Sequence, residues 1–133
     1  MGQTRESGAA GRDYGLKMGG RIAELVGASR LRANSNEVVW EGRRAVIKAA
    51  AVGNDSIGVT AAMLPRLQDV YGAFEDDRGG IELWRIDPSI FEKVSRDSPS
   101  ARNRGTDTRL VRKRQIREQG EQIRYFTKQE IGS

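Results

Sequence analysis

An almost continuous apolar run with one lysine inside it constrains the fold more than any other feature of the sequence. The run covers residues 44–52 and reads Arg-Ala-Val-Ile-Lys-Ala-Ala-Ala-Val. A strand that is apolar on both faces is typical of the centre of a sheet that is covered on both sides. An ammonium group buried there without a partner would be strongly unfavourable. The run therefore predicts a central strand in which Lys48 pairs with a carboxylate or lies at a solvent-open edge.

The segments around this run alternate between the hydrophobic periods of helices and strands. Apolar residues at helical spacing predict a first helix over residues 17–32, followed by several short strands. The predicted strands cover residues 37–41, 44–52, 57–59, 70–74 and 81–86, with a short helix from Thr60 or Leu64 and another over 87–94. This order predicts an α/β (α+β mixed) domain with a small central mixed β-sheet flanked by helices.

The two ends of the chain differ in composition from this core. Residues 1–16 contain four glycines and no hydrophobic period, so we expect a disordered tail. Residues 17–95 form the predicted core domain. Residues 96–133 are predicted as a basic linker followed by a C-terminal arm, with a helix over residues 109–126 that orders on a partner. No apolar stretch reaches the roughly 18–20 residues that span a bilayer, so we expect no membrane partner and a cytoplasmic location.

Positive charge is concentrated in the C-terminal arm. Residues 1–95 carry 13 basic and 13 acidic side chains, whereas residues 96–133 carry ten basic and five acidic ones, which accounts for the whole net charge of +5. A neutral body with a basic segment is typical of proteins that contact phosphates; a solvated tail that aids solubility is the alternative. We predict a nucleic-acid partner, DNA rather than RNA. The predicted contacts are Arg109, Arg112, Lys113, Arg114 and Arg117.

The chain contains neither cysteine nor histidine. Their absence excludes disulfides, thiolate nucleophiles, histidine-based catalytic triads and zinc sites built from these ligands. Any catalysis must use carboxylates, lysine, arginine, tyrosine or hydroxyl groups, and any metal must be an oxygen-ligated ion such as Mg²⁺ or Mn²⁺. The acids expected near Lys48 are Glu24 on the first helix and Glu37 or Glu41 on the adjacent strand.

The order of elements and the run from Arg44 to Ala50 resemble the core of the restriction-endonuclease-like, or PD-(D/E)XK, superfamily over about residues 17–94. In this resemblance Lys48 matches the motif lysine and Glu24 the glutamate of the first helix. Glu37, or else Glu41, matches the acid of the first strand. The resemblance implies a nuclease-like core in which Glu24 and Glu37 hold Mg²⁺ or Mn²⁺. Lys48 would orient the attacking water or stabilise the charge that develops on the phosphate.

The motif acid two residues before the lysine is replaced here by Val46. With one carboxylate fewer, metal affinity should fall steeply, unless Glu24 or Glu41 substitutes for the missing ligand. The sequence therefore leaves open whether the chain is a magnesium-dependent phosphodiester hydrolase or an inactivated relative. Two other hypotheses remain: a non-catalytic binding module whose basic tail folds on a partner, and a homo-oligomer that exchanges its C-terminal arm.

Overall fold

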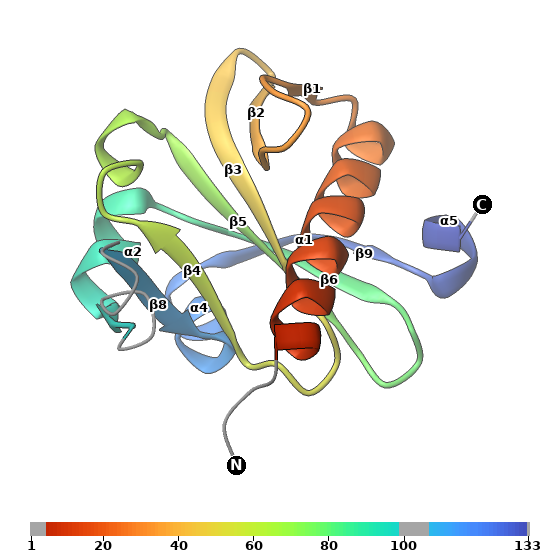
Figure 1. The fold of residues 1–133 in the computed structure, drawn as a ribbon. Helices are drawn as coiled ribbons and strands as arrows, with labels where there is room; N and C mark the ends of the chain where they lie inside the picture. Colours follow the sequence, from red (N-terminus) through yellow and green to blue (C-terminus); the bar gives the residue numbers. More distant parts are fainter. Residues whose placement is uncertain (1–4, 99–106, 133) are drawn as a thin grey trace.

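Six strands form the main sheet of the computed structural model, which describes residues 5–98 and 107–132 and, for residues 5–12, the backbone alone (Figure 1). In sheet order they are β1 (Ser29–Arg30), β2 (Glu37–Trp40), β3 (Arg43–Ala50), β5 (Asp69–Glu75), β6 (Ile81–Ile86) and β9 (Glu121–Phe126). β3 and β5 run parallel, whereas the other neighbouring pairs of this sheet are antiparallel. The mixed α/β class predicted from the sequence is confirmed.

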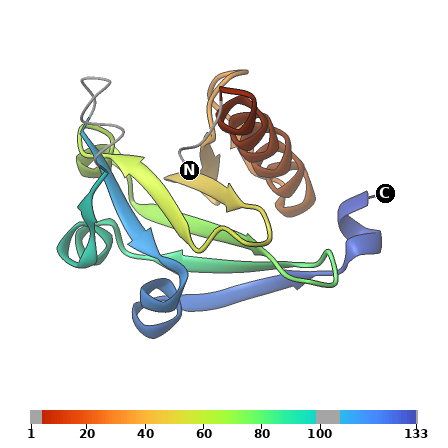
Figure 2. The ribbon, with the colours of Figure 1, turned by 60° about the horizontal axis from the view of Figure 1, so that its bottom comes forward.

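A second, smaller sheet lies against one face of the main sheet. Its strands follow the order β4 (Ser56–Thr60), β8 (Thr108–Arg112) and β7 (Arg96–Asp97). The chain passes from β3 to β5 through β4 and the 3-10 helix η1 (Leu64–Arg66), which allows the two strands to run parallel. Figure 2 shows the helices α2 (Pro88–Val94) and α4 (Lys113–Gln119) on this side and α1 (Arg5–Val26) on the opposite side of the main sheet.

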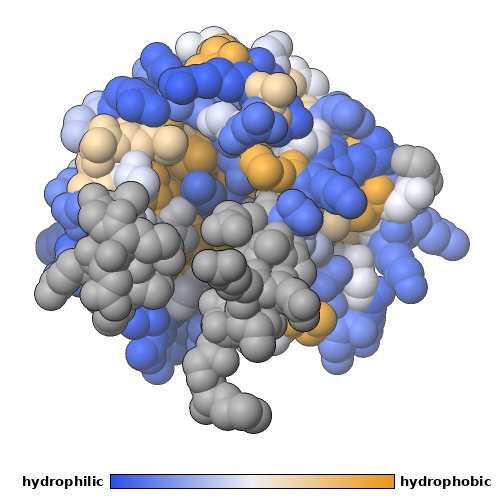
Figure 3. Space-filling view, in the orientation of Figure 1, coloured by the Kyte–Doolittle hydropathy of each residue, from blue (hydrophilic) through white to orange (hydrophobic). Residues whose placement is uncertain are grey.

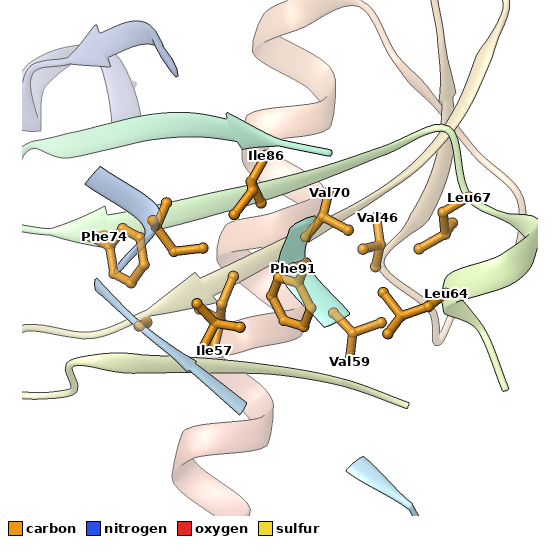
Figure 4. Packing of buried hydrophobic residues seen from close by; sticks show 12 residues of the cluster. Val46, Ile57, Val59, Leu64, Leu67, Val70, Phe74, Ile86 and Phe91 are labelled. Carbon is orange, nitrogen blue, oxygen red and sulfur yellow. The ribbon is translucent and has the colours of Figure 1, made fainter. Parts of the chain in front are cut away.

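The central position of β3 explains why its sequence is apolar on both faces. Ala45 and Ile47 point to the side of α1, where they pack with the buried Ile22. Val46 and Ala50 point to the other side, into a cluster shared with the small sheet, α2 and α4 (Figure 4). Each face of the strand therefore contributes to its own hydrophobic core.

The residues at the start of α2 cap the helix as the sequence predicts. Asp87 precedes Pro88, and its side chain accepts hydrogen bonds from the backbone N–H and the hydroxyl of Ser89. A carboxylate at this position satisfies an N–H group that has no partner inside the helix, and proline at the first position has no such group to lose. The predicted helix over residues 87–94 and the strand over residues 81–86 are both confirmed.

α1 begins at Arg5, so the structure has a helix where a disordered tail is predicted for residues 5–16. Tyr14, Met18 and Ile22 lie four residues apart and share one helix face. Glycine within α1 allows the helix to pack closely on the sheet. A Cβ atom on Gly19 would lie 3.2 Å from the carbonyl oxygen of Ile47 on β3. The helix ends at Val26, short of the predicted residue 32, and residues 29 and 30 form β1 instead. Gly27 follows the helix with a φ of 76°, the left-handed conformation that glycine tolerates best.

The predicted helix over residues 109–126 is wrong, because this segment forms β8, α4 and β9. Val111 is fully buried between the sheets, and Phe126 is buried at the end of the last strand. Gly120 lies between α4 and β9. Only glycine fits at this position, because a Cβ atom there would lie 2.6 Å from the carbonyl oxygen of Arg85 and 2.7 Å from that of Ile116. The C-terminal residues from 107 onward therefore complete both sheets instead of forming an arm. The rest of the predicted linker, residues 99–106, lies outside the described residues.

The apolar residues of this segment pack within the same chain. Ile116 belongs to the cluster shared with the small sheet, and Ile123 and Ile131 pack against the cluster under α1. The exchanged-arm and folding-on-a-partner hypotheses both assume that the apolar residues of this segment have no packing partners in their own chain, whereas the structure shows such partners. On the face drawn in Figure 3, hydrophilic residues predominate and hydrophobic ones form small separate groups. Within the described residues, no helix combines the length and the hydropathy that a bilayer span requires.

Candidate functional site

The structure divides the residues predicted for catalysis between the two faces of the main sheet. Glu37 lies directly across from Val46 in the β2–β3 register, so both point to the face of the small sheet. Lys48, two residues further along β3, points to the same face. Glu24 lies on α1, which covers the opposite face, and its side chain is 73% exposed beside Arg21 at 3.3 Å. Glu41 lies in the β2–β3 turn with a φ of 53°, exposed to solvent.

Glu37 is the most enclosed of these acids, and two arginines bind its carboxylate. Its side chain is 1% exposed. The Nε atom of Arg44 donates to Oε2 at 2.5 Å, while Arg66 donates from Nε to Oε2 at 3.3 Å and from Nη2 to Oε1 at 3.0 Å. The hydrogen bonds from Arg66 are the main cause that holds the pKa of Glu37 below its ordinary value, against the effect of burial and together with those from Arg44. At neutral pH this carboxylate is therefore ionised and charge-paired.

Lys48 has no such partner in the described part of the chain. Burial lowers the pKa of its ammonium group, with no carboxylate contributing to the shift. β2 pairs with β3 only as far as Val46, so Lys48 lies on the part of β3 that extends beyond the end of β2. Its neighbour on β5 is Gly72, and the side chains of Ile57 and Phe74 fill the space above that glycine. Of the two predicted settings for Lys48, the structure shows a partly exposed position near the open edge of β3.

These positions leave the predicted metal ligands apart. Both oxygens of Glu37 accept hydrogen bonds from guanidinium groups, and Glu24 is on the far side of the sheet. Among the described residues, no group of three or more acidic side chains is close enough together to hold a metal ion. The predicted Mg²⁺ or Mn²⁺ site at Glu24 and Glu37 would thus require a metal to displace two arginines from Glu37.

A second set of predicted residues does converge. Arg112 ends β8 and Lys113, Arg114 and Arg117 follow on α4; the four side chains line one open pocket of about 360 Å³ together with Asp55. The backbone N–H of Lys113 donates to the carbonyl oxygen of Asp55, which joins the start of α4 to the loop before β4. We call these four basic residues the α4 cluster.

Glu82, on β6, fixes two members of the α4 cluster. The Nη2 atom of Arg117 donates to both of its carboxylate oxygens, at 2.7 and 2.9 Å, and the Nζ atom of Lys113 lies 3.6 Å away. The Lys113 ammonium also lies 5.5 Å from the centre of the Phe74 ring. Burial alone would raise the pKa of Glu82. The hydrogen bonds from Arg117 and Trp84 and the two positive charges hold that pKa below its ordinary value.

The other two members of the α4 cluster point outward. Arg114 is 81% exposed and lies 3.8 Å from Glu118 on the same helix. Arg112 is exposed, and none of the described acids pairs with it. Exposed pairs such as Arg114–Glu118 contribute little to stability and are readily exchanged for another anion. The α4 cluster therefore contains two basic side chains that Glu82 holds in place and two exposed ones that can bind an external anion.

Arg109 is not part of this cluster. Its guanidinium group forms a salt bridge with Asp97 on β7 and donates from Nε to the Ser95 hydroxyl at 2.9 Å. Arg109 therefore ties β7 to β8, which is a structural role within the small sheet.

Sequence reasoning named Glu37 but missed its partner Arg66, and it missed Glu82, the acid that binds Lys113 and Arg117. Glu82 alternates with the core residues Ile81 and Leu83, which indicates the opposite strand face but not its partners. Arg66 follows Pro65 in a segment that predicts the start of a helix, with no local sign that it reaches Glu37. Such contacts join residues far apart in the chain, so spacing alone could not reveal them.

Neither a protein-family model nor a curated protein sequence matches this chain. The resemblance to the restriction-endonuclease-like superfamily therefore remains a prediction.

Proposed function

We propose that this chain binds DNA through backbone phosphates at the α4 cluster, and that its nuclease-like sheet is a scaffold and not a metal-dependent hydrolase. The convergence of four basic side chains on one open pocket, which Asp55 alone of the described acids lines, carries the proposal. Phosphate contacts of this kind supply most of the sequence-independent affinity for nucleic acid.

The contacts of Glu82 support this proposal. An arginine or lysine that is already fixed loses less side-chain entropy when it binds a phosphate. Glu82 holds Arg117 and Lys113 in this way, and its carboxylate is only 15% exposed, so it faces away from an incoming anion. Arg112 and Arg114 remain available for contacts that a flexible backbone can adjust.

The contacts of Glu37 favour a scaffold over a hydrolase. A two-carboxylate metal site needs oxygens that face the metal, but those of Glu37 face Arg44 and Arg66. The hydrolase remains the second candidate because Glu37 and Lys48 share one face of the sheet, as the resemblance implies.

Fluorescence anisotropy of a short labelled duplex, measured over a series of salt concentrations, tests the DNA-binding proposal. Replacing Arg112 or Arg114 with glutamine should weaken binding to all sequences and reduce the slope of log K against log[salt] by about 0.9 for each lost contact. The control is Arg78→Gln in the exposed β5–β6 hairpin, which removes the same charge from another part of the surface. Salt-independent affinity, or an equal loss from the control, would contradict the proposal.

A further inference from the structure

Arg44 and Arg66 lie next to each other because both bind the same oxygen of Glu37. Two guanidinium groups and one carboxylate leave one positive charge in this group. The two positively charged guanidinium groups repel each other at short range, and the one carboxylate that offsets this repulsion lies on their buried side. A second anion on the outer side would reduce this repulsion.

Both arginines retain hydrogen-bond donors that face away from Glu37. Arg44 uses only its Nε–H on the carboxylate, and Arg66 uses its Nε–H and one N–H of Nη2. A guanidinium group carries five N–H donors in a fixed plane. In the described part of the chain, neither group has another acceptor, and their side chains are 42% and 43% exposed.

Glu37 also fixes the orientation of these donors before any ligand arrives. Its backbone lies in β2, where its N–H donates to the Ser35 hydroxyl at 3.1 Å. The backbone N–H of Arg44 donates to the Gln68 side chain at 2.9 Å, which ties β3 to the segment after η1. A pair of arginines held by a buried acid thus loses less side-chain entropy on binding than an ordinary surface arginine does.

We propose that Arg44 and Arg66 form a binding site for a phosphate group, oriented by Glu37 and separate from the α4 cluster. The planar, forked donors of arginine match the oxygens of a phosphate better than those of a lysine would. Two sources share this chemistry, a free or terminal phosphate and a phosphodiester of nucleic acid, and the experiment distinguishes them.

The test follows the side-chain Nε–H signals of arginine by ¹H–¹⁵N NMR during titration with inorganic phosphate at constant ionic strength. The signals of Arg44 and Arg66 should shift at lower phosphate concentrations than that of Arg78, which lies exposed in the β5–β6 hairpin, outside both proposed sites, and serves as the internal reference. Arg66→Gln should weaken the response of Arg44 about tenfold, the effect expected for one charged hydrogen bond. Arg43→Gln is the matched control, because Arg43 is 51% exposed and pairs with Asp69 instead.

A second titration uses a short oligodeoxynucleotide without terminal phosphates. Shifts of Arg44 and Arg66 with both probes assign the site to phosphodiesters, and shifts with inorganic phosphate alone assign it to free or terminal phosphate. Equal responses of Arg44, Arg66 and Arg78 to phosphate, or no response of Arg44 and Arg66, would overturn the proposal. Because Arg112→Gln and Arg114→Gln leave this site intact, failure of DNA binding at the α4 cluster is distinguishable from failure here.

Discussion

At Glu37, a carboxylate with almost no solvent access is neutralised by two arginines from different elements, Arg44 on β3 and Arg66 on η1. The ion pairs join β2, β3 and the segment that leads into β5 at one point. A buried acid is stable only when it is paired and hydrogen-bonded, so these contacts are a condition for placing an acid there. The residue that resembles a metal ligand in the sequence therefore has a structural explanation.

The pH dependence of stability should report on this carboxylate. The pKa of Glu37 is lowered on folding from an ordinary value of 4.5, so its stabilising contribution is complete above pH 4.5 and is lost as the pH falls through the folded-state pKa. At pH 7 we expect Glu37→Gln to reduce the free energy of unfolding by about 2 kcal/mol, typical of a lost hydrogen bond to a charged group. Urea denaturation between about pH 3 and 7 measures both effects.

The difference between the wild type and Glu37→Gln should shrink below pH 4.5. Glu41→Gln is the control, because Glu41 lies exposed in the β2–β3 turn. A difference that stays constant down to about pH 3, or an equal effect of the control, would show that the Glu37 ion pairs do not stabilise the fold.

At the scale of elements, β8, α4 and β9 hold the two sheets together. β8 supplies the central strand of the small sheet, and β9 forms an edge of the main sheet. α4 connects them and inserts Ile116 into the core. The basic residues of the α4 cluster therefore lie at the end of β8 and on α4, which would position the proposed phosphate contacts better than a flexible tail can.

A chain that ends at residue 95 should lose its cooperative unfolding transition. The truncation removes the fully buried Val111 and Ile116 and the buried Phe126. Each contributes about 1.5–3 kcal/mol of hydrophobic stabilisation, and together they approach the roughly 5–15 kcal/mol that stabilises a whole domain. Circular dichroism and urea denaturation of the shortened chain test this.

The matched control is a chain that ends at residue 127, from which only α5 (Lys128–Gly132) and Ser133 are missing. None of the α5 residues is buried, so this chain should retain a cooperative transition. A chain of residues 1–95 that unfolds as cooperatively as the control would show that the C-terminal segment is a dispensable arm.

The contrast between residues 81–94 and residues 109–126 shows what sequence patterns could predict. In the first segment, alternating apolar residues predict a strand, and Asp87 followed by Pro88 predicts the start of a helix. Both predicted elements are present in the structure. In the second, Leu110, Ile116 and Ile123 fit loosely to a helix, although Gly120 interrupts it. Their strand partners, β4 and β6, lie far away in the sequence, so no local period could reveal them.

The candidate sites show the same limit. The sequence indicated Lys48 as an exceptional residue within an apolar strand and the group from Arg112 to Arg117 as a basic cluster. It could not show that Glu24 lies on the opposite face, because the side of the sheet that a helix covers is set by tertiary packing. Similarly, only the folded chain brings Glu82 beneath Lys113 and Arg117.

For the whole molecule, the proposal of a non-catalytic scaffold predicts no metal-dependent cleavage. Plasmid DNA incubated with Mg²⁺ or Mn²⁺ should be nicked no faster than with EDTA, because Glu37 is charge-paired and Glu24 lies beyond the sheet. Lys48→Ala should bind the labelled duplex as the wild type does. Nicking that requires the metal and disappears in Lys48→Ala would instead establish the hydrolase.

The placement of β8 and β9 also has a consequence for the order in which the molecule can form during translation. The parallel pair β3–β5 and the hairpin partner β6 are made first, but the strand that completes the small sheet and the edge strand of the main sheet follow only at residues 108–126. Until residues 111–126 have left the ribosome, the core on the side of the small sheet lacks Val111 and Ile116, and the edge of β6 lacks its partner β9. Such surfaces are those that chaperones bind and that aggregate at high concentration. The risk of aggregation is therefore greatest in the interval between the synthesis of β6 and that of β9.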